Sequence, residues 1–560
     1  MSSVLKKEWF FLVIILILFL GLRLPAIHLP YHQDEYKWVQ YSHPEITPPG
    51  TVPHPPLTEF IYTKIGPLVG DNNFRSIPLF FGVINLFLLY YCMRFLLNPK
   101  TAQIAALIFT LSFHSVLASL MVDVDGAIMP FFFLILLIGY YKWKQTDFSF
   151  SKESYKWIAL VLVGAIGGFF IKVSSILPIC AVFLDFIIEK KAFSDKKKIA
   201  KYIGYGLGGL IALFILLILS KFIFPFFHFE YALKYWEHFI ALDRGWLQTF
   251  IQCIKALLYS SPFLVFIPLL IEKKDLIKTR VLVIFLVLAF IFYIVLFDFS
   301  IGALDRYLEL LVIPLTIFAS IAIVNISDKK ESGSKNYFFY GIFVSAIIFL
   351  LVFVNHYVPP LYPKTEWISR ILSFKWNFLY PFSGGSGPLA FYVSFLFMAL
   401  LWIVSFIAII FSIWKPEYRK KVLFFLIPLG LLYNGMFIEE YLFGFVNGSA
   451  SKLVMETTKY IESNKDIQKV TVYNDNGGWN IQAIGKYRRR LYIDPKFDIT
   501  EKINTINRYK EHYMVVDIPR IDSNTVYAKF FSTCDVVFEK HSGVISSRVY
   551  DCRNAPNIKI

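Results

Sequence analysis

The chain has 560 residues, of which 56% are hydrophobic and 18% are aromatic, with 59 Phe. A soluble domain does not need that much apolar surface, so the composition excludes an ordinary water-soluble protein. The formal net charge is +16. In a membrane protein such an excess is usually Lys and Arg beside the cytoplasmic ends of the spans, so we expect no nucleic-acid partner.

Apolar runs of about 15–24 residues recur along the chain, long enough to cross a bilayer about 30 Å thick. The first run follows Lys6-Lys7 and lacks a small-residue cleavage site, so it reads as an uncleaved anchor and not as a signal peptide. We therefore predict a polytopic α-helical membrane protein with about thirteen spans. They cover residues 9–25, 77–97, 102–121, 126–141, 157–171, 174–189, 202–220, 256–271, 281–297, 308–325, 337–354, 390–413 and 421–439.

The connections between these runs alternate in charge. One set is short and rich in lysine, as in 142–156, 190–201 and 273–280. Positive charge stays on the cytoplasmic side of a membrane, so the N-terminus is predicted to be cytoplasmic. Thirteen crossings then place the C-terminal tail outside the cell membrane. The long loop 26–76 is outside as well, and so are the polar residues at the opposite span ends.

The first acidic residues of that loop are Asp34-Glu35. Two adjacent carboxylates at a membrane edge are costly unless something uses them, so a general base or a metal ligand is one interpretation. A helix N-cap or a solvated loop is the other. Tyr31, Tyr36 and Trp38 surround the pair, and such rings suit a membrane interface or a wall on which a sugar stacks.

Further along the same loop, the run His54-Pro-Pro-Leu57 predicts a rigid turn, because two prolines fix φ and remove backbone donors. Simple stiffening of the loop would explain the run equally well. The short turn Asp123-Val-Asp125 has two interpretations too. Paired carboxylates hold Mg²⁺ or Mn²⁺ through oxygen. Alternatively, Asp125 caps the helix that follows.

Lys172 and Arg306-Tyr307 are the cationic positions at outer span ends. Arginine binds phosphate through two parallel hydrogen bonds and lysine as a point charge, so an anionic lipid head group is a plausible ligand. Snorkelling of Lys172 is the alternative, and a local ion pair with Asp305 is the alternative for Arg306. The sequence has no zinc spacing, no Walker loop and no dinucleotide fingerprint.

The tail, residues 446–560, is polar and differs in composition from the membrane domain, residues 1–445. Short β-like runs at 470–473 and 514–517 follow a helical stretch, so we predict a small extracytoplasmic α/β domain. Cys534 and Cys552 lie in this tail and can form a disulfide if it faces an oxidising compartment.

A first span followed by Asp34-Glu35 and His54-Pro-Pro-Leu57 resembles the GT-C glycosyltransferase superfamily. The chain is most similar to the dolichyl-phosphate-mannose protein mannosyltransferase type and to bacterial aminoarabinose and lipopolysaccharide-core sugar transferases. The Asp123/Asp125 turn, Lys172 and the run that begins Arg306-Tyr-Leu fit the same pattern. A tail that contains the run from Val472 to Gly478 is also similar to outer domains of this group.

The resemblance implies a polyprenyl-phosphate-linked sugar as donor and transfer on the outer membrane face to a glycan, lipid or protein acceptor. Asp34 takes the position of the catalytic carboxylate, with Glu35 as the second candidate. Phosphate binding falls to four residues: Lys172, Arg306, Tyr307 and His54. A divalent cation (Mg²⁺ or Mn²⁺) is not obligatory, because the lipid phosphate already leaves easily. A transporter or lipid-linked sugar flippase is the alternative, since it also has many spans and intramembrane polar residues.

Overall fold

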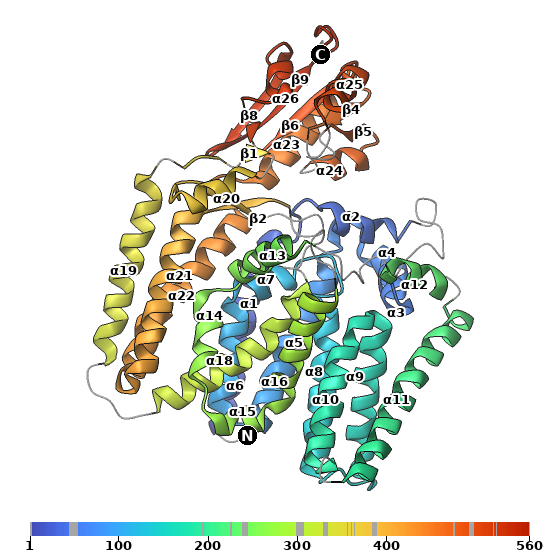
Figure 1. The fold of residues 1–560 in the computed structure, drawn as a ribbon, viewed down its shortest axis with the longest axis vertical. Helices are drawn as coiled ribbons and strands as arrows, with labels where there is room; N and C mark the ends of the chain where they lie inside the picture. Colours follow the sequence, from blue (N-terminus) through green and yellow to red (C-terminus); the bar gives the residue numbers. More distant parts are fainter. Residues whose placement is uncertain are drawn as a thin grey trace. The chain divides into compact units, whose positions relative to one another are not determined.

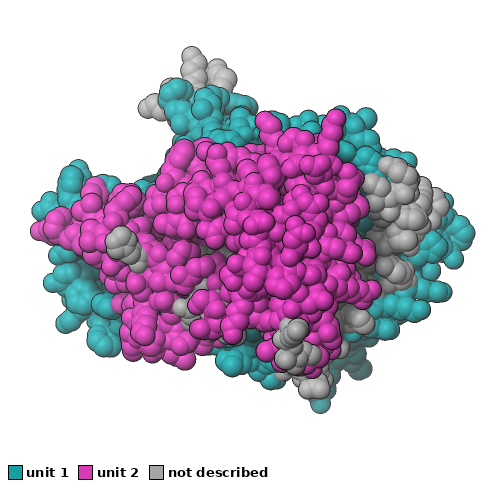
Figure 2. Space-filling view, turned by 90° about the horizontal axis from the view of Figure 1, so that it is seen from above, with its two compact units in different colours: residues 1–28, 37–339, 405–431 teal, residues 29–36, 340–404, 432–560 magenta. Residues whose placement is uncertain are grey.

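The structure of the protein is a computed structural model. It describes residues 3–43, 54–192, 195–224, 227–237, 245–297, 307–328, 334–355, 357–359, 361–362, 365–382, 389–473, 477–491, 498–518, 520–521 and 523–558. The chain divides into two compact units, coloured in Figure 2. Unit 1 comprises residues 1–28, 37–339 and 405–431, and unit 2 comprises residues 29–36, 340–404 and 432–560.

Unit 1 is helical (Figure 1). Its longer helices are α1 (Ser3–Gly21), α5 (Ser76–Leu96), α6 (Pro99–Leu111), α8 (Ile128–Gln145), α9 (Tyr155–Ile171), α10 (Ile176–Glu189), α11 (Lys196–Leu219), α13 (Trp246–Tyr259), α16 (Arg280–Phe290) and α18 (Val312–Ser327). Shorter helices connect them: α2 (Gln33–Gln40), which starts in unit 2, α3 (Pro56–Phe60), α4 (Gly66–Val69), α7 (Phe113–Ala118), α12 (Phe229–Glu237), α14 (Pro262–Phe266) and α15 (Lys273–Lys278).

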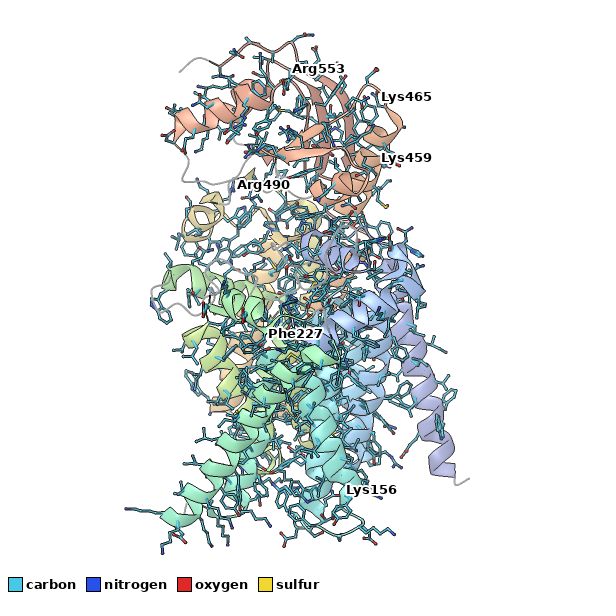
Figure 3. The ribbon with its side chains drawn as sticks, turned by 90° about the vertical axis from the view of Figure 1, so that its right-hand side faces the viewer. Lys156, Phe227, Lys459, Lys465, Arg490 and Arg553 are labelled. Atoms are coloured by element: carbon cyan, nitrogen blue, oxygen red, sulfur yellow. A yellow bond between two sulfur atoms is a disulfide. The ribbon has the colours of Figure 1, made fainter. Side chains whose placement is uncertain are left out.

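Helices α8 and α9 pack closely because glycines face the neighbouring backbone. A Cβ added at Gly164 would lie 2.6 Å from the Leu136 backbone nitrogen, and one at Gly139 would lie 2.7 Å from that of Val161. Small residues that allow two backbones to approach are typical of helix contacts in membranes. Because α8 and α9 are antiparallel, the last residues of α8 and the first residues of α9 lie at the same end of the unit. In Figure 3, Lys156 marks the end where α9 begins.

Phe227 lies towards the other end of α9, where it packs in one cluster with Phe169, Leu217 and Ala232 (Figure 3). Lys172 directly follows α9 at this end. The lysine-rich turns and Lys172 therefore lie at opposite ends of the same helices, as the charge pattern predicts.

Seven helices of the described residues are long and apolar enough to span a membrane, or eight if the bent pair α13–α14 counts as one span. The protein is an integral membrane protein, but the predicted count of thirteen is not confirmed. Three predicted spans are wrong in detail. The span 102–121 ends its first helix at Ser112, the span 256–271 bends by 104° before Pro262, and the start of the span 390–413 is a strand.

Physical reasons for these breaks are visible in the sequence. Ser112 is the extended N-cap of α7. Ser261 has an extended backbone, and its side chain accepts a hydrogen bond from the Leu264 amide, so it caps α14, with Pro262 in the first turn. Capping serines and N-terminal prolines end one helix and start another even inside an apolar run.

Unit 2 contains most of α19 (Ser334–Val354), part of α21 (Phe395–Trp414) and the end of α22 (Arg419–Leu442). A small hairpin, β2 (Leu379–Phe382) with β3 (Phe391–Ser394), precedes α21, and α20 (Thr365–Leu372) precedes β2. The remainder is the predicted α/β tail, in which helices precede and separate most of the strands along the sequence. Its elements are α23 (Ala450–Ser463), β4 (Val470–Val472), α24 (Gly478–Ala483), β5 (Tyr487–Arg490), α25 (Ile499–Tyr509), β6 (Tyr513–Asp517), α26 (Val526–Phe531), β8 (Asp535–Ser542) and β9 (Ile545–Asp551).

The five strands of the tail form one sheet in the order β5-β4-β6-β9-β8 (Figure 1). Strand β4 is parallel to β5 and β6, whereas β9 is antiparallel to β6 and β8. A pair outside this sheet, β1 (Leu361–Tyr362) with β7 (Arg520–Ile521), is parallel. Cys534 and Cys552 form a disulfide, a pairing that the sequence left open.

Candidate functional site

The acidic pair of the outer loop lies in the first turn of α2. Glu35 is buried, with 1% of its surface exposed, and its Oε2 accepts a hydrogen bond from the His32 amide at 3.1 Å. The Glu35 amide donates in turn to the His32 carbonyl at 2.7 Å. This reciprocal arrangement caps the helix. Asp34 is half-buried, so the two neighbouring carboxylates differ in their exposure to solvent.

The tail domain holds the segment that carries this pair. Asn480 Nδ2, in α24, donates to the Tyr31 carbonyl at 3.2 Å. The ring of Trp479 contacts the ring of Tyr36, with centroids 6.2 Å apart. All four residues belong to unit 2, and Asp34 lies between the two contacts in the sequence. Sequence reasoning missed Trp479 and Asn480, because 449 positions separate the hydrogen-bonded residues and no local pattern links them.

In unit 1, three of the predicted residues come together. Lys172 Nζ contacts both carboxylate oxygens of Asp125, at 2.5 and 2.6 Å. The same ammonium lies over the ring of Tyr307, 4.0 Å from its centroid, a cation–π contact. The side chains of Lys172 and Asp125 are only 15% and 4% exposed. The Lys172–Asp125 pair is therefore a largely desolvated ion pair with an aromatic face on its cation.

The alternative role of Asp125, as the cap of α8, is not what the structure shows. Helix α8 has Ala127 as its N-cap and no side-chain capping bond. Asp123 Oδ1 instead accepts hydrogen bonds from the amides of Val124 and Asp125, so Asp123 fixes the turn. Among the described residues no group of three or more His, Cys, Asp or Glu is placed to hold a metal. Metal binding at this turn stays a prediction.

The proline run of the outer loop begins α3 in unit 1, with Pro55 as its N-cap. The ring of His54 stacks on Trp38, with centroids 4.8 Å apart. Thr58 Oγ1 donates to the carbonyl of Ile171, the residue before Lys172, at 2.5 Å. The loop is thus fastened next to the ion pair. Arg306, the other predicted phosphate ligand, lies outside the described residues.

A cavity of about 370 Å³ borders the same loop. Its lining residues are Pro56, Leu57, Glu59, Phe60, Thr63, Lys64, Ile223 and Phe224. Glu59 is 3% exposed, and burial raises its pKa to about 7. Sequence reasoning missed it, although an acidic residue two positions after the proline run, in an otherwise apolar stretch, was a readable signal.

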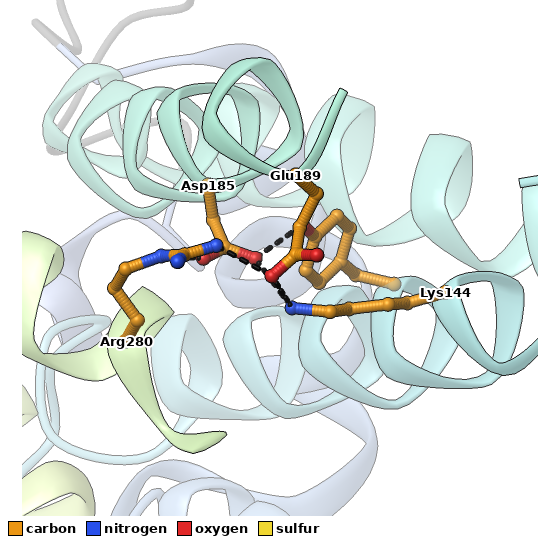
Figure 4. Close-up of polar contacts among 5 residues, drawn as sticks. Lys144, Asp185, Glu189 and Arg280 are labelled. Carbon is orange, nitrogen blue, oxygen red and sulfur yellow. Dashed lines mark hydrogen bonds and ion pairs between the residues drawn. The ribbon is translucent and has the colours of Figure 1, made fainter. Parts of the chain in front are cut away.

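A second group of buried charges lies at the other end of α8 and α10 (Figure 4), and we call it the α8–α10–α16 cluster. Asp185 is fully buried and receives Arg280 Nε at 2.5 Å, Lys144 Nζ at 3.1 Å and the Tyr140 hydroxyl at 2.5 Å. Glu189 Oε1 accepts hydrogen bonds from the same two cations, from Lys144 at 2.7 Å and from Arg280 at 2.6 Å. Every charge in the cluster has a partner of opposite sign.

Comparisons with known proteins bear on both family and fold. Residues 53–220 match the family model of dolichyl-phosphate-mannose-protein mannosyltransferase. This stretch includes His54, Asp123, Asp125 and Lys172, whereas Asp34 precedes it. No curated protein matches the chain.

Solved structures match along the whole chain. ArnT from Cupriavidus metallidurans in the apo state has a TM-score of 0.54 at 11% identity, covering 98% of each chain. ArnT bound to undecaprenyl phosphate has a TM-score of 0.55 with the same identity and coverage. The archaeal oligosaccharyltransferase AglB from Archaeoglobus fulgidus covers 92% of this chain and 70% of its own, at 11% identity and a TM-score of 0.48.

The family match covers the second half of the outer loop, from residue 53, and the Lys172–Asp125 pair, and the fold match to ArnT extends over the membrane helices and the α/β tail. Together they confirm the resemblance predicted from the sequence: this chain has the fold of the GT-C glycosyltransferase superfamily.

Proposed function

We propose that the protein is a glycosyltransferase that moves a sugar from a polyprenyl-phosphate-linked donor to an acceptor hydroxyl or amine at the outer membrane face. The observation that carries the proposal is the desolvated Lys172 ammonium, which contacts Asp125 and the ring of Tyr307. Both Lys172 and Asp125 lie within the family-matched region. ArnT, which shares the fold, has been crystallised with undecaprenyl phosphate. A lipid-linked donor arrives at the membrane surface, so an ammonium at a helix end is at the depth of its phosphate.

In the proposed reaction, the acceptor oxygen or nitrogen forms a bond to the anomeric carbon while the bond from that carbon to the phosphate oxygen breaks. The leaving polyprenyl phosphate takes the electron pair, and Lys172 stabilises its negative charge. Asp34 takes the proton of the acceptor. A single displacement with one base inverts the configuration at the anomeric carbon, by the geometry used for inverting glycosidases.

Arg306, Tyr307 and His54 complete the proposed phosphate site. Tyr307 already faces the Lys172 ammonium, and His54 is oriented by Trp38. The disulfide of the tail supports an extracytoplasmic tail and a cytoplasmic N-terminus, because disulfides persist in oxidising compartments.

The test is an assay of Asp34→Asn in purified protein supplied with the lipid that copurifies with it, identified by mass spectrometry. Sugar transfer should fall at least 100-fold, since the acceptor proton loses its base. Asp71→Asn is the matched control, because Asp71 is an exposed carboxylate of the same loop. Full transfer by Asp34→Asn would remove the proposed base. Translocation of the lipid-linked sugar without a glycosyl product would instead identify a flippase.

A further inference from the structure

Glu59 is a buried carboxylate in the wall of the outer-loop cavity. Its Oε2 atom is fully enclosed and has no hydrogen-bond partner among the described residues. The residue before it, Thr58, is fixed by its bond to the Ile171 carbonyl, so α3 cannot easily turn the acid towards water. Burying a carboxyl group without a partner costs free energy, and native proteins rarely leave one so unless a ligand uses it.

The walls of the cavity show what kind of group would fit. Phe60 and Phe224 meet edge to face, with ring centroids 6.2 Å apart. Lys64 and Thr63 add an ammonium and a hydroxyl to the lining, and Lys64 is exposed. A volume of about 370 Å³ lies within the range of small-molecule sites.

A carboxylate that accepts hydrogen bonds, an ammonium and a hydroxyl that donate them, and flat aromatic walls together match a sugar ring. Such a ring presents hydroxyl groups at its edge and apolar C–H groups on its face. A purely apolar ligand would leave Glu59 unpaired, and a phosphate would be repelled by it.

We propose that the Glu59 cavity is a subsite for a hydroxyl-bearing sugar ring, with Glu59 as its hydrogen-bond acceptor. The subsite rests on the proposed function. The ring belongs either to the donor or to a glycan acceptor, and kinetics tell these sources apart. The KM of whichever substrate carries the ring should depend on Glu59.

The first experiment measures steady-state transfer and thermal unfolding of Glu59→Gln and Glu59→Leu. Both changes remove an unpaired buried acid, so we expect the unfolding temperature to stay the same or rise. The KM of one substrate should rise at least ten-fold for Glu59→Leu and less for Glu59→Gln, which keeps an oxygen acceptor. Glu230→Gln, an exposed acid of α12 in the same unit, is the control and should leave every parameter unchanged.

The second experiment needs no turnover. Apolar carbodiimides modify protonated carboxyl groups in apolar surroundings, so dicyclohexylcarbodiimide at pH 6 should label Glu59, as read by peptide mass spectrometry. Methyl α-mannopyranoside should slow this labelling at least two-fold, whereas cyclohexanol, which fills space with a single hydroxyl, should not.

Two outcomes would overturn the subsite. One is unchanged KM values for both substrates in Glu59→Leu. The other is equal labelling with and without the glycoside. If Asp34→Asn is inactive in the same assays, these outcomes remove only the subsite. If Asp34→Asn keeps full activity, the proposed base has failed, and if the unchanged protein forms no glycosyl product, the proposed function itself has failed.

Discussion

Buried charges have different partners at the two ends of the bundle that contains α8 and α10. In the α8–α10–α16 cluster, Asp185 and Glu189 share two cations, and a tyrosine hydroxyl completes the set. At the other end, the Lys172 ammonium contacts the carboxylate of Asp125 and presents its second side to the ring of Tyr307. The first arrangement is closed, whereas the second keeps a cation from which a stronger anion can displace the carboxylate.

This difference teaches how to separate a structural ion network from a substrate site. A network in which each charge is satisfied from several helices has no capacity left for a ligand, however strongly it perturbs its members. A lysine that contacts one carboxylate and the face of an aromatic ring, as Lys172 does, does have that capacity. Variants of the two ends should therefore separate stability from activity.

The largest effect is expected from Lys172→Met. Removing the ammonium takes an ion-pair partner from the buried carboxylate of Asp125, which should lower the free energy of unfolding by about 3 kcal/mol. Transfer should also fall by about 100-fold or more, because the departing phosphate loses its electrostatic partner. A double variant, Lys172→Met with Asp125→Asn, separates the loss of stability from the loss of transfer. Chemical denaturation measures the first and transfer assays measure the second.

In that double variant the buried charge is gone from both partners, so stability should return while transfer remains low. Recovery of transfer together with stability would mean that Lys172 has only a structural role.

At the opposite end, Arg280→Met should cost about 3 kcal/mol of stability, since Asp185 is fully buried and keeps only Lys144 as a cation. The specific activity of the folded fraction should equal that of the unchanged protein. Thermal unfolding followed by assay of the intact fraction checks both. A loss of specific activity beyond two-fold would contradict the structural assignment of the α8–α10–α16 cluster.

A smaller effect is expected where α24 holds the segment before α2. Asn480→Ala removes the bond to the Tyr31 carbonyl and should lower kcat about ten-fold, because the carboxylate of Asp34 is then less well placed. The KM values should stay unchanged. Gln482→Ala removes an exposed amide from the same helix and serves as the control. Hydrogen exchange of the α2 amides should quicken in Asn480→Ala only.

The smallest effect concerns pH. The pKa of Glu59 is raised from 4.5 to about 7 in the folded protein, so the folded state holds this proton more tightly than the unfolded chain. Stability from this group is therefore present at low pH and is lost as pH rises from about 4.5 to 7. Glu59→Gln should flatten the decline of the unfolding temperature over that range. An identical slope in both proteins would show that Glu59 does not titrate there.

Much of this arrangement was readable from local sequence. Lysine-rich turns and lone outer cations predict which residues share a membrane end. Lys172, Asp125 and Tyr307 do lie together, but their direct contacts were not predicted. Helix breaks were harder, because Ser112 turns extended without a side-chain cap and Ser261 caps a helix inside an apolar run.

Local sequence does not predict how deeply a side chain is buried or which distant residue it contacts. Glu59 becomes notable only once its side chain is seen to be enclosed without a partner. The bond from Asn480 to Tyr31 spans nearly the whole chain, and no periodicity or motif reports such a pair.

The assignment of residues 29–36 to the same compact unit as the tail has a practical consequence for protein engineering. A chimera that exchanges the tail at residue 446 would pair a foreign α24 with the native Tyr31 and Tyr36. Grafts that carry the octapeptide from Leu29 to Tyr36 along with the new tail keep these two contacts matched. The exchangeable module of this scaffold is therefore discontinuous, with one short piece at residues 29–36 and one long piece from residue 446 onwards.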